Sequence, residues 1–156
     1  MPKIDMSKAV VRTSTVYPGE FADATRGREK TALGNVAGLT QFGVNLTRLK
    51  PGAASSLRHW HEQEDEFVYV LEGEVALIED EGETVLRAGE AAGFKAGVPD
   101  GHCLVNRADR DAVVLEVGTR AASERAHYPG ADLIFERAGK SARFCHLSGE
   151  PYPEQR

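Results

Sequence analysis

Hydrophobic positions along the chain fall in short runs that are rich in β-branched and aromatic residues, with glycines and prolines between them. The segment EDEGE, which contains Gly82, has the composition of a hairpin turn between two of these runs. Short strands about 8–12 residues apart, joined by glycine turns, are typical of an antiparallel sandwich or barrel. The pattern therefore predicts an all-β fold with strands at residues 42–49, 66–71, 74–78, 83–86, 102–105 and 112–117.

Helical patterns are scarce, and two segments lie outside the strand pattern. No helical period persists beyond about 12 residues, and the best candidate is a short helix within residues 119–127. A chain of 156 residues suits one domain, so neither end forms a second one. We expect an irregular N-terminal arm at 1–40, a barrel core at 41–118 and a C-terminal extension at 119–156 that packs on the barrel.

The apolar runs and the cysteines exclude several classes of protein. The longest apolar runs have about three to six residues, whereas a membrane span needs about 20. The N-terminal segment lacks the apolar core of a signal peptide. Cys103 and Cys145 cannot form the framework of a disulfide-rich protein, and we expect both to be reduced thiols. We therefore expect a cytoplasmic protein with no membrane partner.

The net charge of −5 is unevenly distributed along the chain. Between Glu62 and Glu90 there are eleven acidic residues and one basic residue, Arg87, so this block carries about −10. Such a block repels phosphate backbones, and we expect no nucleic-acid partner. Most of these acids are expected to be solvated residues of turns and sheet edges.

The residues with metal-binding chemistry gather in the segment GAASSLRHWHEQEDEFVYVLEG, residues 52–73. His59 and His61 are two apart, so in a strand they project from the same face. If the strand that begins at Glu66 pairs antiparallel with theirs, its carboxylate returns beside both rings. His102, in GVPDGHCLVN, supplies a third imidazole. Three imidazoles and one carboxylate predict a site for a divalent transition metal such as Mn, Fe, Ni or Zn.

These residues resemble the two sequence motifs of the cupin superfamily. The first motif corresponds to Gly52, His59, His61, Glu66 and Gly73, with one extra residue before the first histidine. The second corresponds to Gly89, Lys95, Gly97, His102 and Asn106, with lysine where proline is usual and two extra residues before the histidine. Counting forward from Gly97 selects Asp100 as the fourth ligand, whereas counting back from Asn106 selects His102. We favour His102, because imidazole binds transition metals at neutral pH.

The resemblance, which covers about residues 40–118, implies a fold, a cofactor and a class of activity. The implied fold is a double-stranded β-helix, a jelly-roll-like barrel that holds a metal and a small ligand inside. The implied assembly is a homodimer, and the outward parity of Phe67, Tyr69 and Trp60 agrees with it. Similar single-domain members are described as sugar-phosphate isomerase-like. We therefore expect an isomerase-like enzyme for a small polar sugar or sugar phosphate, with a non-catalytic ligand-binding cupin and an Fe(II)-dependent dioxygenase as the alternatives.

Two further carboxylates are candidates for proton transfer in such an enzyme. Glu64 has the same parity as Glu66 and is also an alternative ligand. Glu116 lies in the apolar run 112–117, so it either faces the cavity or pairs with an arginine. We expect these two residues to act as general acid or base.

Overall fold

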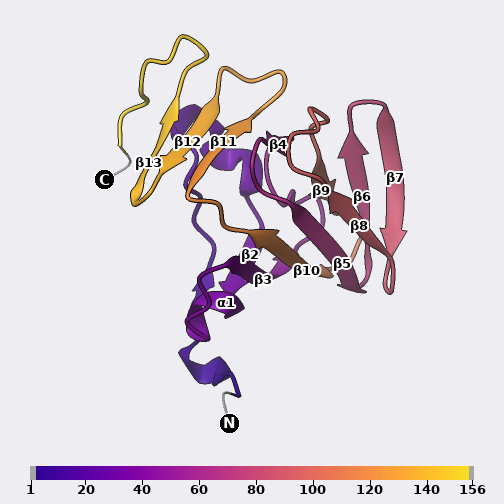
Figure 1. Cartoon of the computed structure of the whole chain (residues 1–156). Helices are drawn as coiled ribbons and strands as arrows, with labels where there is room; N and C mark the ends of the chain where they lie inside the picture. The colour runs from indigo at the N-terminus through magenta and orange to yellow at the C-terminus, as the bar shows by residue number, and fades with distance from the viewer. Residues whose placement is uncertain (1–2, 155–156) are drawn as a thin grey trace.

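The computed structural model describes residues 3–154, and most of its regular elements are strands (Figure 1). In chain order the strands are β1 (Val11–Arg12), β2 (Arg28–Ala32), β3 (Phe42–Leu49), β4 (Trp60–His61), β5 (Glu66–Glu72), β6 (Glu74–Glu79), β7 (Gly82–Arg87), β8 (Ala91–Phe94), β9 (Cys103–Val105), β10 (Ala112–Thr119), β11 (Ser123–His127), β12 (Ile134–Ala138) and β13 (Ser141–Cys145). The helical segments are short: η1 (Met6–Lys8), η2 (Gly19–Thr25) and α1 (Leu33–Val36). The all-β prediction is confirmed.

The strands form three antiparallel sheets that surround the interior. The six-stranded sheet has the order β1-β2-β3-β10-β5-β8, the four-stranded sheet β13-β12-β11-β4, and the three-stranded sheet β7-β6-β9. The main hydrophobic core lies between the six-stranded and three-stranded sheets, where alternate residues such as Val70, Val75 and Val114 are buried. A second cluster packs Tyr17, from the N-terminal segment, against Tyr128 and Leu133.

The six predicted strands are all present, as β3, β5, β6, β7, β9 and β10. Alternation explains why they were predictable. In β5 the side chains of Val68 and Val70 are buried, whereas Phe67, Tyr69 and Leu71 are exposed. The EDEGE turn joins β6 to β7, as predicted, with Glu79 opposite Gly82 in the ladder.

The glycine that ends the first motif has a structural role in this part of the fold. Gly73 adopts a φ of 73°, between β5 and β6. A Cβ at this position would come within 2.8 Å of the Asp111 carbonyl oxygen and 3.1 Å of the Ala112 Cα. Both the backbone conformation and the close approach of β10 therefore require glycine here.

One expectation about secondary structure is wrong, and the strand pairing raised as a condition for the metal site does not form. Residues 119–127 do not form a helix. They contain β11, in which the alternate side chains of Glu124 and Ala126 are buried, and β11 pairs with both β12 and β4. The strand that carries the histidines does not pair with the strand of Glu66. β4 pairs with β11, and β5 pairs with β10 and β8, so β4 and β5 belong to different sheets.

The N-terminal segment extends the six-stranded sheet. β2 pairs along its length with β3, and β1 pairs with β2. η1 projects away from the body of the molecule (Figure 1). None of the described helices is long and apolar enough to cross a membrane. Both cysteines are free and buried.

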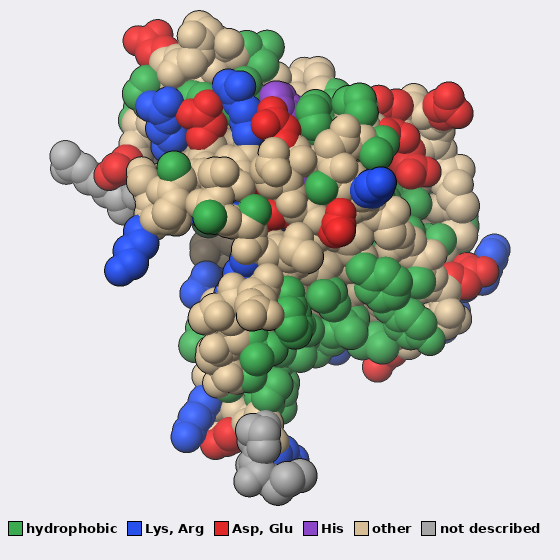
Figure 2. Space-filling view, viewed as in Figure 1, with side chains coloured by type: hydrophobic (Ala, Val, Ile, Leu, Met, Phe, Trp, Pro, Cys, Tyr) green, Lys and Arg blue, Asp and Glu red, His purple; other side chains and the backbone are tan. Residues whose placement is uncertain are grey.

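Hydrophobic side chains also gather on the outer surface. Figure 2 shows them over β5 and β8 and extending toward the N-terminal segment. The outward-facing residues of β5 belong to the exposed set, with Phe67 44% and Leu71 43% accessible. Such a surface is compatible with the predicted homodimer, which stays a prediction.

Candidate metal centre

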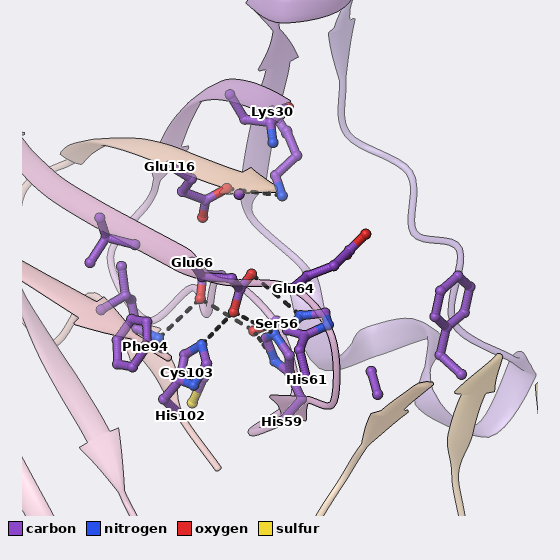
Figure 3. Close-up of a pocket in the computed structure, with 18 of the residues that line it drawn as sticks. Lys30, Ser56, His59, His61, Glu64, Glu66, Phe94, His102, Cys103 and Glu116 are labelled. Carbon is purple, nitrogen blue, oxygen red and sulfur yellow. Dashed lines mark hydrogen bonds and ion pairs between the residues drawn. The ribbon is translucent and has the colours of Figure 1, made fainter. Parts of the chain in front are cut away.

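The backbone brings two of the predicted histidines side by side. His59 and His102 form an isolated antiparallel bridge in which each residue donates its N–H to the other's carbonyl oxygen, at 3.1 and 2.9 Å. His61 lies on the same face as His59 at the end of β4. Glu66, the first residue of β5, faces these rings across the interior (Figure 3). The structure thus assembles the four residues from three separate segments.

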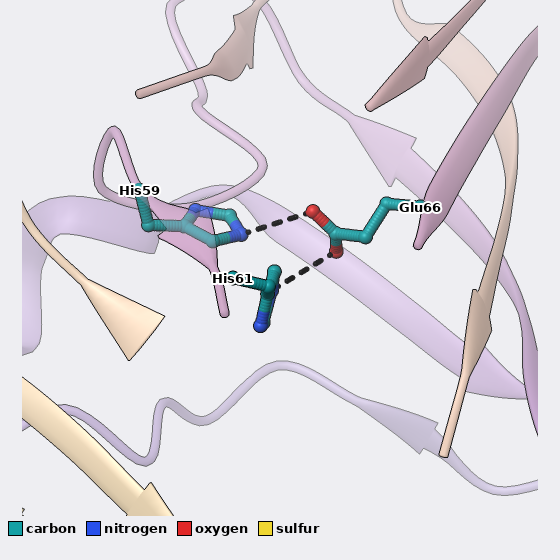
Figure 4. A group of neighbouring side chains, drawn as sticks. All are labelled: His59, His61 and Glu66. Atoms are coloured by element: carbon teal, nitrogen blue, oxygen red, sulfur yellow. Dashed lines mark ion pairs between the residues drawn. The ribbon is translucent and has the colours of Figure 1, made fainter. Parts of the chain in front are cut away.

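Three imidazole nitrogens face one carboxylate. The Nε2 atom of His102 lies 2.6 Å from Glu66 Oε2, and that of His59 lies 3.3 Å from the same oxygen. The Nε2 atom of His61 is 3.5 Å from Glu66 Oε1 (Figure 4). The ligand atoms of His59, His61 and Glu66 all lie within 4.8 Å of one another. These contacts place all four predicted ligands in one cluster.

The electrostatics of the cluster favour an ionised carboxylate. Burial raises the pKa of the Glu66 carboxyl, but hydrogen bonds from the three imidazoles outweigh burial and hold the pKa well below its usual range. Burial lowers the pKa of His102, and the charge of His59 lowers it further, against the bond to Glu66. Burial also lowers the pKa of His61, but its bond to Glu66 and the nearby charges of Glu66 and Glu124 raise it above the ordinary value.

The donor set fits a divalent transition metal. The Nδ1–H of His59 donates to Leu57 O at 2.8 Å, which orients the ring so that its Nε2 atom faces Glu66. The Nδ1 atoms of His61 and His102 are buried and have no hydrogen-bond partner among the described residues. All three rings therefore present Nε2 to one point beside a carboxylate, the arrangement in which imidazoles ligate such metals. This group of side chains could hold one ion.

Glu124 supports the cluster and was missed in the sequence. Its side chain is completely buried and accepts hydrogen bonds from the backbone N–H groups of Glu62 at 2.9 Å and Gln63 at 3.1 Å. Its Oε1 atom lies 3.7 Å from His61 Nδ1. Nothing in the sequence distinguishes it, because its segment is the best candidate for a short helix. In the structure, alternate side chains of β11, those of Glu124 and Ala126, are buried, and this alternation places Glu124 inside.

The two predicted proton-transfer residues line the same cavity as the cluster, and each has a cationic partner. Glu64 is buried and accepts from Arg137 and from the Ala121 N–H at 2.9 Å. Glu116 faces the cavity, where its Oε2 lies 2.9 Å from Lys30 Nζ and accepts from Thr47 Oγ1 at 3.0 Å. The partner of Glu116 is thus a lysine rather than an arginine.

The carboxylate of the alternative fourth ligand, Asp100, bonds to a backbone N–H instead of to the cluster. Asp100 Oδ1 accepts from the Asp80 N–H at 3.0 Å, in the loop that precedes the His102 bridge. His102 instead stacks on Phe94, with ring centroids 3.5 Å apart, and faces Glu66. Of the two candidates, His102 is therefore the one beside the other ligands.

The cluster separates two cavities. The larger has a volume of about 380 Å³ and extends from the cluster to β2, β3 and β10. The smaller, about 230 Å³, lies on the side of Trp60, Lys95 and Val98. His61, Glu66 and His102 line both. A small molecule in the larger cavity would thus contact the cluster directly.

Comparisons with known proteins agree on one family. The Cupin domain family matches residues 45–118. A sugar phosphate isomerase of a cupin superfamily from Silicibacter pomeroyi is 45% identical to this chain, with a TM-score of 0.92 and 97% of each chain covered. A proposed sugar phosphate isomerase from Acidithiobacillus ferrooxidans is 25% identical, with a TM-score of 0.73, over 82% of this chain and 81% of the other.

A more distant structure shares the fold alone. The polyketide cyclase RemF from Streptomyces resistomycificus is 21% identical, with a TM-score of 0.62, over 76% of this chain and 79% of that protein. No curated protein matches the chain.

Proposed function

Because the chain belongs to the cupin superfamily, we propose that it is a metal-dependent isomerase for a small sugar or sugar phosphate. The observation that carries the proposal is the convergence of three imidazoles on the Glu66 carboxylate at the wall of a cavity. The sugar phosphate isomerase from Silicibacter pomeroyi, similar over nearly the whole chain, supports the choice of reaction. The predicted cytoplasmic location and homodimer belong to the same proposal.

The four clustered side chains would hold the ion through His59, His61 and His102 Nε2 and a Glu66 carboxylate oxygen. A divalent ion bound there supplies a Lewis acid, which polarises a substrate carbonyl. The Nδ1–H bond from His59 to Leu57 O directs its Nε2 atom toward Glu66 and the proposed ion site. The chain's own contribution to binding is therefore a preformed set of three imidazoles and one carboxylate.

Isomerisation of a sugar also needs a base to move a proton between adjacent carbons. Glu64 and Glu116 are the carboxylates we assign to this step, since both line the cavity and both are held by a cation. Arg137 and Lys30 fix the positions of these carboxylates on the wall. A carboxylate oxygen accepts the proton from the carbon beside the carbonyl and returns it to the former carbonyl carbon. The proton of the adjacent hydroxyl moves to the former carbonyl oxygen, so that the carbonyl and the hydroxyl exchange places.

The experiment combines metal analysis with an assay of proton exchange. We expect the purified protein to bind one divalent transition metal per chain, and His102→Ala and Glu66→Gln to lose it. His146→Ala is the matched control, because His146 pairs with Asp132 outside the cavity. With a panel of sugar phosphates in deuterated water, we expect isomerisation with deuterium at the exchanged carbon. The active base should lose about 10²–10⁴-fold in kcat as Glu64→Gln or Glu116→Gln.

Other outcomes would reject the proposal. A chain that binds no metal at any tested concentration has no such centre. Binding of a sugar phosphate without turnover would favour a non-catalytic cupin. Oxygen uptake by the iron-loaded protein would favour a dioxygenase, because isomerisation consumes no oxygen.

A further inference from the structure

The larger cavity contains more cationic than acidic side chains. Its charged lining residues are Arg28, Lys30, Arg120 and Arg137, with Glu64, Glu66 and Glu116. Lys30 and Arg137 each have a carboxylate partner, and Glu66 faces the histidines. Within residues 3–154, Arg28 and Arg120 form no ion pair with a carboxylate. The cavity therefore has positive charge that its own acids do not neutralise, before any metal is added.

Arg28 is the less satisfied of these two arginines. Its guanidinium donates to Ser55 O at 2.7 Å and to Ser14 O at 3.5 Å, both neutral carbonyl oxygens. Its Nε atom is buried and has no hydrogen-bond partner among the described residues. Arg120, in contrast, lies at the exposed rim and bonds to Leu39 O and Asn35 Oδ1. An arginine has five donors and always carries its charge, so Arg28 still has capacity for an anion.

The position of Arg28 relates it to the candidate metal centre. Arg28 and Lys30 are two apart on β2, so both project from the same face of the strand toward the cavity. The carbonyl oxygen of Ser55 accepts from Arg28, and the Oγ atom of Ser55 lies 3.4 Å from Ser56 Oγ. Ser56 Oγ in turn lies 3.2 Å from His59 Nδ1. Lys30 and Glu116 lie on one side of the pocket, and His59 and His102 on the other (Figure 3).

We propose that Arg28, with Lys30 beside it, forms a subsite for the phosphate group of a phosphorylated substrate. A phosphate monoester presents three oxygens, which suit the forked donors of a guanidinium and a neighbouring ammonium. The substrate would then reach from this cationic wall to the histidine cluster. The assignment rests on the proposed function for the end of the substrate that reacts, but phosphate binding itself does not depend on turnover.

Inorganic phosphate is the probe for the subsite, used on protein stripped of metal by a chelator. We expect phosphate to raise the melting temperature more than acetate at equal ionic strength. Arg28→Gln should abolish this difference, and Arg28→Lys should keep part of it, because lysine retains the charge but not the fork. Arg48→Gln is the matched control, since Arg48 pairs with Asp111 outside the cavity, and should respond as the wild type does.

Two results would overturn the subsite. One is an equal phosphate response in Arg28→Gln and wild type. The other is a response only in metal-loaded protein, which would assign the phosphate to the ion. Because Arg28 also holds the Ser55 backbone, circular dichroism and metal stoichiometry must first show that the variant is folded. If Arg28→Gln does not fold, Arg28→Lys is the deciding variant. A full wild-type rise in melting temperature in Arg28→Lys at the lowest phosphate concentrations would contradict binding of phosphate by the forked guanidinium donors.

The substrate measurement separates this inference from the proposed function. If the enzyme isomerises sugar phosphates, Arg28→Gln should lower the ratio of kcat/KM for the phosphorylated to the unphosphorylated sugar by about tenfold or more. An unchanged ratio would reject the subsite while leaving the isomerase intact. If no sugar is isomerised, the phosphate titration still tests the subsite alone.

Discussion

At the scale of single residues, the orientation of His59 depends on the backbone of one residue, Leu57. The carbonyl oxygen of Leu57 accepts from His59 Nδ1, and the N–H of Leu57 donates to the Tyr17 hydroxyl at 3.2 Å. Tyr17 is buried and meets Tyr128 edge-on, with ring centroids 5.7 Å apart. The Tyr128 ring in turn lies 5.8 Å from that of His59. A tyrosine of the N-terminal segment thus helps to position a candidate ligand.

Tyr17→Phe tests this indirect support. The change leaves the Leu57 N–H without a partner, so we expect the free energy of unfolding to fall by about 1–3 kcal/mol. Because His59 loses part of its support, metal affinity should fall by up to about tenfold. Urea denaturation and metal titration measure the two effects. Tyr69→Phe, on the outward face of β5, is the control, and wild-type values for both measurements in Tyr17→Phe would contradict the role.

The sequence allows some of these residues to be predicted and not others. The candidate ligands could be selected because His59, His61 and Glu66 lie within one short segment and their residue types carry the chemistry. Tyr17 could not, since its contact with Leu57 spans 40 residues and no local pattern records it. Arg28 could not be predicted from the sequence either, because only the pairing of β2 with β3 places it in the cavity wall.

At the scale of elements, the two-residue strand β4 is too short to hold its own position, and its neighbours hold it in place. Ala126 pairs with His61, and His127 pairs with Trp60 and stacks on its ring, with centroids 4.3 Å apart. Glu124 adds side-chain bonds to the turn that follows β4. β4 does not pair with β5, because a strand's neighbour is set by the whole topology, whereas parity sets only which residues share a face.

Glu124→Gln tests whether β11 holds the ligand strand in place. The glutamine keeps the size of the side chain but replaces one accepting oxygen with a donor amide, which faces backbone N–H groups. We expect a loss of about 1–3 kcal/mol in the free energy of unfolding and weaker metal binding. Glu83→Gln, which breaks only the exposed pair with Arg107, should cost at most about 1 kcal/mol. Equal losses of unfolding free energy in the two variants would show that the buried contacts of Glu124 stabilise the fold no more than an exposed ion pair does.

The missed strands of the C-terminal extension share one physical reason. β11, β12 and β13 read SERAH, IFERA and SARFC, short and charged segments without a clear apolar alternation. Their pairing is supported by ion pairs across the sheet, in which Glu136 lies 3.1 Å from Arg125 and 2.8 Å from Arg143. Such cross-strand pairs are visible only once the register is known. β5 and β10 were predictable because their buried residues are apolar.

At the scale of the whole molecule, the candidate ligands join the three sheets. His61 belongs to β4 of the four-stranded sheet, and Glu66 to β5 of the six-stranded sheet. His102 directly precedes β9 of the three-stranded sheet and is bridged to His59. An ion bound by these side chains would link sheets that otherwise meet through side-chain packing and loops. Metal binding should therefore be coupled to the stability of the entire fold.

Thermal unfolding with and without metal tests this coupling. At a free metal concentration 100 times the Kd, binding to the folded chain alone adds about 2.7 kcal/mol. For a chain of this size each kcal/mol shifts Tm by about 2–4 °C, so we expect a rise of about 5–10 °C, which a chelator reverses. His102→Ala and Glu66→Gln should show no rise, whereas His146→Ala should show the wild-type rise. If titration detects binding but Tm does not change, the ion does not select the folded arrangement of the three sheets, and the cluster is not the site that binds it.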